Sequence, residues 1–81
     1  MVLYRRSHLT KVVLMYSVEV RCHVEDLAAV MSRMRQWLDT QRFQPDIFRH
    51  TVIDESVTIR LQFKVESQTT AFAEAFSGQL L

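Results

Sequence analysis

Apolar and polar residues alternate along the run from Lys11 to His23. The even-numbered positions of this run are all apolar, namely Val12, Leu14, Tyr16, Val18, Val20 and Cys22. Successive side chains of a strand point to opposite faces, so the pattern predicts a β-strand over 11–23 with one buried face. Val13 and Met15 make the first half of this strand apolar on its other face as well. We therefore predict that Val13 and Met15 contribute to a homodimer interface.

A helical pattern follows this strand. Apolar residues recur there at spacings of three and four, at Leu27, Val30, Met31, Met34, Trp37 and Leu38. This spacing predicts an amphipathic helix of roughly 15 residues that ends near 40–42. Glu25 and Asp26 precede it, and the helix dipole favours carboxylates in a first turn.

A second strand and a second helix are indicated in the C-terminal half. Apolar and polar residues alternate over 57–65, which predicts a half-buried strand. Ser67 is then the expected N-cap of a helix, and Gly78 the expected left-handed residue that ends it. The predicted buried residues of this helix are Phe72, Ala75 and Phe76, with Ala71 beside them.

The stretch 47–53 is rich in β-branched and aromatic residues and predicts another strand, but its buried face depends on the following turn. A two-residue turn within 54–56 would place on the face of Val57 the side chains of Phe48, His50 and Val52. A three-residue turn would place there instead Ile47, Arg49, Thr51 and Ile53. We favour the two-residue turn because it buries no arginine.

The predicted order is strand, helix, strand, strand, helix. With right-handed connections it predicts an α+β fold, the ferredoxin-like plait, with two helices on one face of an antiparallel sheet and a short or absent last strand. The free edge of the first strand is then unprotected, which is a second argument for a dimer. The topology resembles that of ACT-type regulatory modules and of the small monooxygenases of the dimeric α+β barrel group. Residues 1–8 are expected to form a flexible arm and residues 9–81 one domain, although Met15 leaves open an alternative start.

Composition and charge exclude several functions. Ten basic and nine acidic residues give a net charge of +1, but Arg5, Arg6 and Lys11 lie in the first 14 residues, so 15–81 carry −2. This predicts no nucleic-acid partner, since the domain lacks a basic surface. No apolar stretch is longer than that of 12–16, which is far shorter than the roughly 20 residues of a membrane helix, so we predict no membrane partner. One cysteine excludes an internal disulfide and favours the reducing cytoplasm.

The residues that resemble a reactive site are Cys22, His23 and Glu25, with His50 as a further candidate. Cys22 and His23 are neighbours on a strand and point to opposite faces, so they cannot converge on one metal ion. Cys22 lies on the apolar face, where cysteine behaves as a small hydrophobic residue. We predict no catalytic residue, no metal site and no cofactor.

The function that fits these features is a small, non-enzymatic, self-associating interaction or regulatory module. The alternative is a dimeric small-molecule-binding protein or enzyme of the dimeric α+β barrel type, with a pocket between helices and sheet. Met34, Trp37 and Phe72 are the candidate residues lining that pocket. A continuous pocket with converging polar groups would favour the alternative, and a filled core would favour the module.

Overall fold

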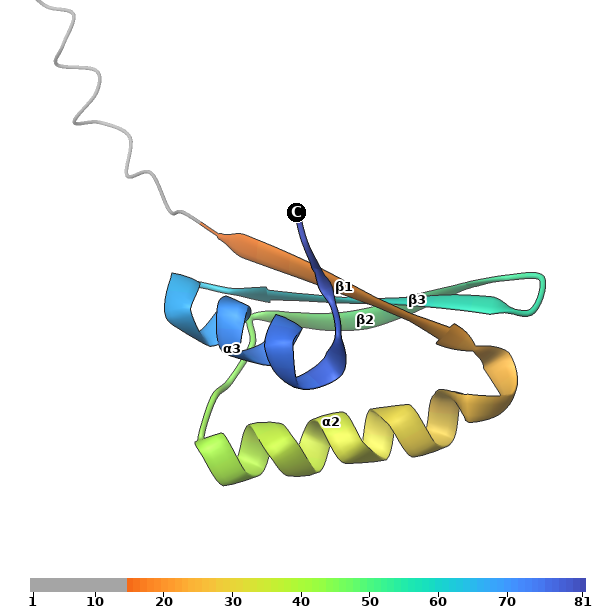
Figure 1. The fold of residues 1–81 in the computed structure, drawn as a ribbon, viewed down its shortest axis with the longest axis horizontal. Helices are drawn as coiled ribbons and strands as arrows, with labels where there is room; N and C mark the ends of the chain where they lie inside the picture. Colours follow the sequence, from red (N-terminus) through yellow and green to blue (C-terminus); the bar gives the residue numbers. More distant parts are fainter. Residues whose placement is uncertain (1–14) are drawn as a thin grey trace, which may run out of the picture.

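The computed structural model describes residues 15–81, which form two helices packed on a four-stranded antiparallel sheet. In chain order the elements are β1 (Tyr16–His23), the 3-10 turn η1 (Val24–Asp26), α2 (Leu27–Gln41), β2 (Ile47–Ile53), β3 (Ser56–Phe63), α3 (Glu66–Phe76) and β4 (Gln79–Leu80). The strand order across the sheet is β2-β3-β1-β4, and both helices lie on one side of it (Figure 1). The predicted α+β architecture is confirmed. The predicted arm 1–8 and the first part of the predicted strand, 11–14, lie outside the described residues.

The core lies between this sheet and the helices. β1 and β3 pair along eight residues each, with Val18 opposite Leu61 and Val20 opposite Ile59. On the helix side of β3, every second side chain has no exposed surface, at Val57, Ile59, Leu61 and Phe63. The period of two in the sequence thus corresponds to one buried face in each central strand.

Helix α2 contributes Val30, Met34 and Leu38 to this core, as its spacing of three and four predicts. The helix ends at Gln41, inside the predicted range. Arg42 then takes a left-handed conformation with φ of 62°, and the next amide, that of Phe43, donates to the Leu38 carbonyl at 3.0 Å. This cap satisfies a carbonyl that the helix itself leaves unpaired.

A two-residue turn joins β2 and β3, as the sequence analysis favoured. Ile53 pairs with Ser56 and Val52 with Val57, which leaves Asp54 and Glu55 in the turn. Asp54 has a φ of 56°, a conformation that aspartate tolerates better than most residues. The pairing puts Phe48, His50 and Val52 on the helix side of the sheet and the β2 arginine on the other side.

The predicted ends of the second helix were wrong in detail. Ser67 lies inside α3, and the N-cap is Val65, whose carbonyl accepts a hydrogen bond from the Thr69 hydroxyl at 3.2 Å. At the other end Ser77, with φ of 53°, is the left-handed residue. Gly78 is required for space, because a Cβ atom there would lie 2.8 Å from a methyl group of Val18.

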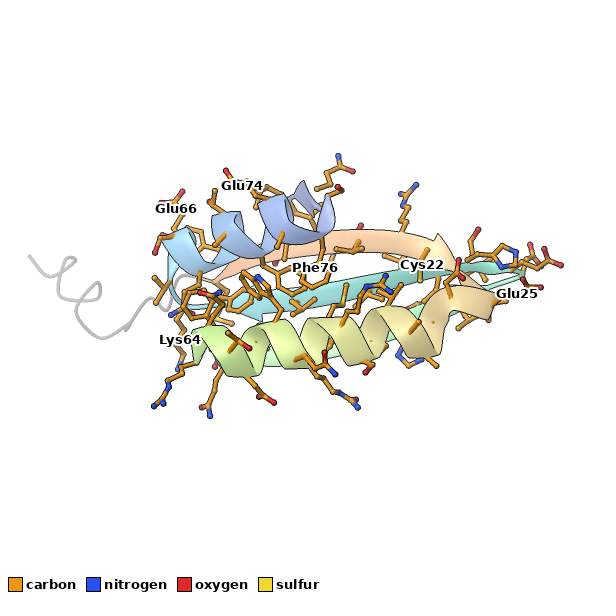
Figure 2. The ribbon with its side chains drawn as sticks, turned by 60° about the horizontal axis from the view of Figure 1, so that its bottom comes forward. Cys22, Glu25, Lys64, Glu66, Glu74 and Phe76 are labelled. Atoms are coloured by element: carbon orange, nitrogen blue, oxygen red, sulfur yellow. The ribbon has the colours of Figure 1, made fainter. Side chains whose placement is uncertain are left out.

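Aromatic side chains fill the space between the two helices (Figure 2). The Trp37 ring lies edge-on to three phenylalanine rings, with centroids 5.6 to 5.9 Å away, at Phe43, Phe72 and Phe76. Phe72 is fully buried against Phe63, whereas Phe76 is partly exposed in the gap. Ala73, not the predicted Ala75, completes the buried face of α3.

This difference in burial separates the two phenylalanines in a stability experiment. Phe72→Ala should lower the free energy of unfolding by about 3–5 kcal/mol, since it empties a fully enclosed site. Phe76→Ala should cost clearly less, and Glu74→Ala on the exposed side of α3 less than about 0.5 kcal/mol. Urea titrations of the three variants test this order. Equal losses for Phe72→Ala and Phe76→Ala would contradict the packing described.

Candidate functional site

The two residues predicted for a dimer interface lie at the start of the described chain. Val13 falls outside the described residues. Met15 is partly buried and immediately precedes β1. A single chain does not test their role, which stays a prediction.

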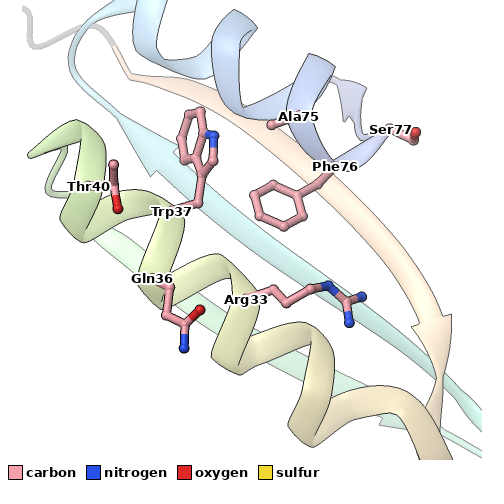
Figure 3. A pocket seen from close by; sticks show the side chains of 7 residues that line it. All are labelled: Arg33, Gln36, Trp37, Thr40, Ala75, Phe76 and Ser77. Atoms are coloured by element: carbon pink, nitrogen blue, oxygen red, sulfur yellow. The ribbon is translucent and has the colours of Figure 1, made fainter.

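The three residues predicted to line a pocket have different surroundings. Met34 and Phe72 have no exposed surface and belong to the core. Trp37 lines an open hollow between α2 and α3, together with Phe76 and Ala75 (Figure 3). The polar residues around this hollow are Arg33, Gln36, Thr40 and Ser77. The hollow is thus lined by the two helices and the residue that follows α3, and no sheet residue lines it.

Cys22 and His23 are the last two residues of β1. Cys22 lies at the same end of the molecule as Glu25 (Figure 2). Cys22 is partly buried against the core, and this burial, together with the negative charge of Asp26, raises the pKa of its thiol. His23 caps the turn η1, because its Nδ1 accepts a hydrogen bond from the Glu25 amide at 3.2 Å. Its Nε2 lies 3.3 Å from a carboxylate oxygen of Glu55 in the β2–β3 turn. These contacts connect the end of β1 to the turn η1 and to the β2–β3 turn, and they give His23 a structural role.

The two edges of the sheet differ in their protection. The outer edge of β1 is partly covered by β4, which pairs with Val18 and Glu19, and the Leu81 amide donates to the Ser17 carbonyl at 3.0 Å. The short last strand therefore covers part of the edge that the sequence predicted to be free. The outer edge of β2 pairs with no strand of residues 15–81.

The turn between β2 and β3 determines which backbone N–H and C=O groups of β2 point away from β3. In an antiparallel pair, residues alternate between hydrogen-bonded and non-hydrogen-bonded positions. A two-residue hairpin turn begins and ends with a hydrogen-bonded pair, here Ile53 and Ser56. The N–H and C=O groups that point away from β3 are therefore those of Phe48, His50 and Val52.

The side chains of β2 leave this edge accessible. Its last five residues, 49–53, are exposed, with Val52 46% and Ile53 68% accessible. Lysine and proline, which commonly protect edge strands, do not occur in β2. The guanidinium of Arg35 lies 5.9 Å from the centre of the Phe48 ring, so α2 approaches the first part of the strand. The edge from 48 to 52 is the candidate interaction surface of this protein.

The central part of the helix-free face of the sheet is polar and positively charged. Arg60 donates to a carboxylate oxygen of Glu19 from Nε at 3.2 Å and from Nη2 at 2.8 Å, which links β3 to β1. Arg49 lies directly opposite Arg60, and Arg21 opposite Thr58. Three arginines therefore share this face with one glutamate on the central part of β1, β2 and β3, and like charges placed opposite each other are unfavourable.

Comparisons with protein-family models, with curated proteins and with solved structures gave no match to this chain. Within residues 15–81, no helix has the length and apolar character needed to cross a membrane. The same residues contain no group of three or more His, Cys, Asp or Glu side chains arranged to hold a metal ion.

The free edge of β2 was not predicted from the sequence. The edge predicted to be free was that of the first strand, because the last strand was expected to be short or absent. A signal for β2 was nevertheless present, since the run from Ile47 to Ile53 has apolar residues at both ends and contains neither lysine nor proline.

The environment of Cys22 predicts a slow thiol. A raised pKa leaves little thiolate at neutral pH, and the thiolate is the reactive form. We expect a maleimide or disulfide reagent to label the native protein much more slowly than the urea-unfolded chain at pH 7, and the native rate to rise with pH into the alkaline range. Asp26→Asn, which removes the neighbouring negative charge, should speed native labelling. Native labelling as fast as unfolded labelling at neutral pH would contradict this account.

Proposed function

We propose that this protein is a small, non-enzymatic module that acts by self-association, on a ferredoxin-like plait in the cytoplasm. The strand order β2-β3-β1-β4 supports the plait, because its two central strands are the first and third of the chain. The helices α2 and α3 provide the two crossover connections on one face. The cytoplasmic location rests on the composition, which includes one cysteine.

The free edge of β2 is the observation that carries this proposal. An exposed strand edge presents a row of unpaired donors and acceptors that can pair with another chain. In this protein the edge is flanked by exposed apolar side chains, of which Val52 and Ile53 are the largest contributors. A second copy of the same strand would satisfy the outward groups of Phe48, His50 and Val52 and reduce that exposure.

The filled core also favours a module over a small-molecule enzyme. A filled core leaves no room for a ligand between helices and sheet, which a small-molecule enzyme of this fold would need. Met34 and Phe72 occupy the space between helix and sheet without exposed surface. The open hollow beside Trp37 lies outside this core, so the alternative function would have to use a surface between the helices rather than a pocket above the sheet.

Sedimentation velocity of the full chain, from low micromolar to near-millimolar concentration, tests the proposal. The interface along the two paired β2 edges, here called the seam, contains one strand from each copy and is therefore small. We expect a monomer–dimer equilibrium in the micromolar range rather than an obligate dimer. His50→Pro removes an N–H that points away from β3, and proline is tolerated at such edge positions. We expect this variant to remain folded and to be monomeric at every concentration.

Two further variants control this experiment. Thr51→Pro removes an N–H that points toward β3, so it should lower the stability of the monomer itself. Val52→Lys keeps the backbone donor and places a charge on the edge, so it should also weaken association while circular dichroism stays unchanged. A wild-type protein that stays monomeric throughout the range would overturn the proposed function. Wild-type self-association that neither His50→Pro nor Val52→Lys weakens would exclude the β2 edge.

A further inference from the structure

We propose that two copies pair through their β2 strands in one register, with His50 opposite His50 of the partner subunit. This inference rests on the proposed function and specifies its interface. The result is a continuous eight-stranded antiparallel sheet whose two-fold axis passes between the two His50 residues. The proposal follows from the backbone of β2, from the order of its side chains and from a comparison with the neighbouring registers.

The backbone allows only a few registers. Two antiparallel edges must place outward-pointing residues opposite one another, and these are Phe48, His50 and Val52 on each strand. With His50 at the centre, Phe48 of each chain pairs with Val52 of the partner subunit, and all the outward groups of both strands are used. If the centre of the pairing moves to residue 49 or to residue 51, at least one outward-pointing residue of each β2 strand lies opposite a residue outside β2 of the partner subunit.

The side chains of β2 are ordered so that this register is self-complementary. The sequence from 47 to 53 is Ile-Phe-Arg-His-Thr-Val-Ile, which is apolar at both ends and polar at its centre. Around His50, Ile47 faces Ile53 of the partner subunit, and Arg49 faces Thr51 of the partner subunit. Apolar side chains therefore meet apolar ones on both faces of the seam, and no arginine lies directly opposite another. Cross-strand pairs of this kind are what stabilise a sheet.

The neighbouring registers are less favourable. A centre at Arg49 places two arginines directly opposite each other, and like charges at that position repel. It also leaves Ile53, the most exposed of the large apolar residues within 15–81, without a partner in β2. A centre at Thr51 places Phe48 opposite Asp54 in the turn of the partner subunit, where the strand has ended. Register is set by the apolar pattern, and this pattern selects His50.

The proposed pairing is also compatible with the positions of the helices and of the charged side chains in the two copies. Residues directly opposite each other in a sheet project to the same face, so the helix layers of both copies lie on one side. The arginine-bearing faces of both copies join on the other side, where Arg49 is next to a threonine hydroxyl of the partner subunit. The proposed pairing thus adds no directly opposed like charges to the existing opposition of Arg49 and Arg60 within each chain.

Disulfide trapping tests the register in a Cys22→Ala background. In the proposed pairing, positions 49 and 51 of partner chains lie directly opposite each other in a non-hydrogen-bonded pair, with Cα atoms about 4.5 Å apart. That separation is within the range of a disulfide. We expect an equimolar mixture of Arg49→Cys and Thr51→Cys chains to form heterodimers under mild oxidation several-fold faster than either variant forms homodimers. His50→Cys should form homodimers by itself.

The other outcomes identify where the proposal fails. Val52→Cys is the matched control, because its counterpart in the partner is four residues away along the seam and should not be trapped. Fast homodimers of Arg49→Cys or of Thr51→Cys would move the centre to that residue and overturn the register. If no variant is trapped while sedimentation still detects a dimer, this interface is wrong and the proposed function stands. If sedimentation detects monomers only, both are wrong.

Discussion

Strand β3 is the element on which the rest of this structure depends. It pairs along eight residues with β1 and along seven with β2, so it holds the sheet together from its centre. Its four helix-side residues, from Val57 to Phe63, have no exposed surface and form the floor of the core. Fully burying a Val, Ile, Leu or Phe side chain contributes about 1.5–3 kcal/mol, so these four residues contribute substantially to the stability of the domain.

The helices complete the core over β1 and β3 but do not extend over all of β2. Helix α3 buries Phe72 against Phe63, and α2 buries Met34 and Leu38. Two helices of 11 and 15 residues suffice to cover the two central strands. β2 is therefore held by its pairing with β3, and its far edge and last residues are left exposed. Within residues 15–81, the candidate interaction surface is the part of the sheet that α2 and α3 leave exposed.

Much of this fold could be predicted from local patterns. The alternation over 57–65 corresponds to β3, which ends two residues earlier, at Phe63, and the helical spacing over 27–38 corresponds to α2. The pairing of Glu19 with Arg60 follows from the strand registers. Choices that depend on the surroundings were not predictable. Ser77 takes the left-handed conformation expected of Gly78, and Gly78 is instead needed because Val18 and Val20 approach it closely.

The candidate site was the least predictable part, for a physical reason. Whether a strand edge is free depends on the strand order and on what covers each edge, and neither is encoded in a local period. The sequence pointed to the edge of β1, part of which β4 covers, and to a pocket whose predicted residues Met34 and Phe72 lie in the core. The exposed edge of β2 became recognisable only when the order β2-β3-β1-β4 placed it at the border of the sheet.

Amide hydrogen exchange of individual β2 residues, measured at low and at high protein concentration, tests whether the β2 edge pairs with a second copy. We expect the amides of Arg49, Thr51 and Ile53 to be protected at both concentrations, because they point toward β3. The amides of Phe48, His50 and Val52 should exchange freely in the dilute protein and become protected as the concentration rises. Rapid exchange of these three amides at every concentration would contradict the account.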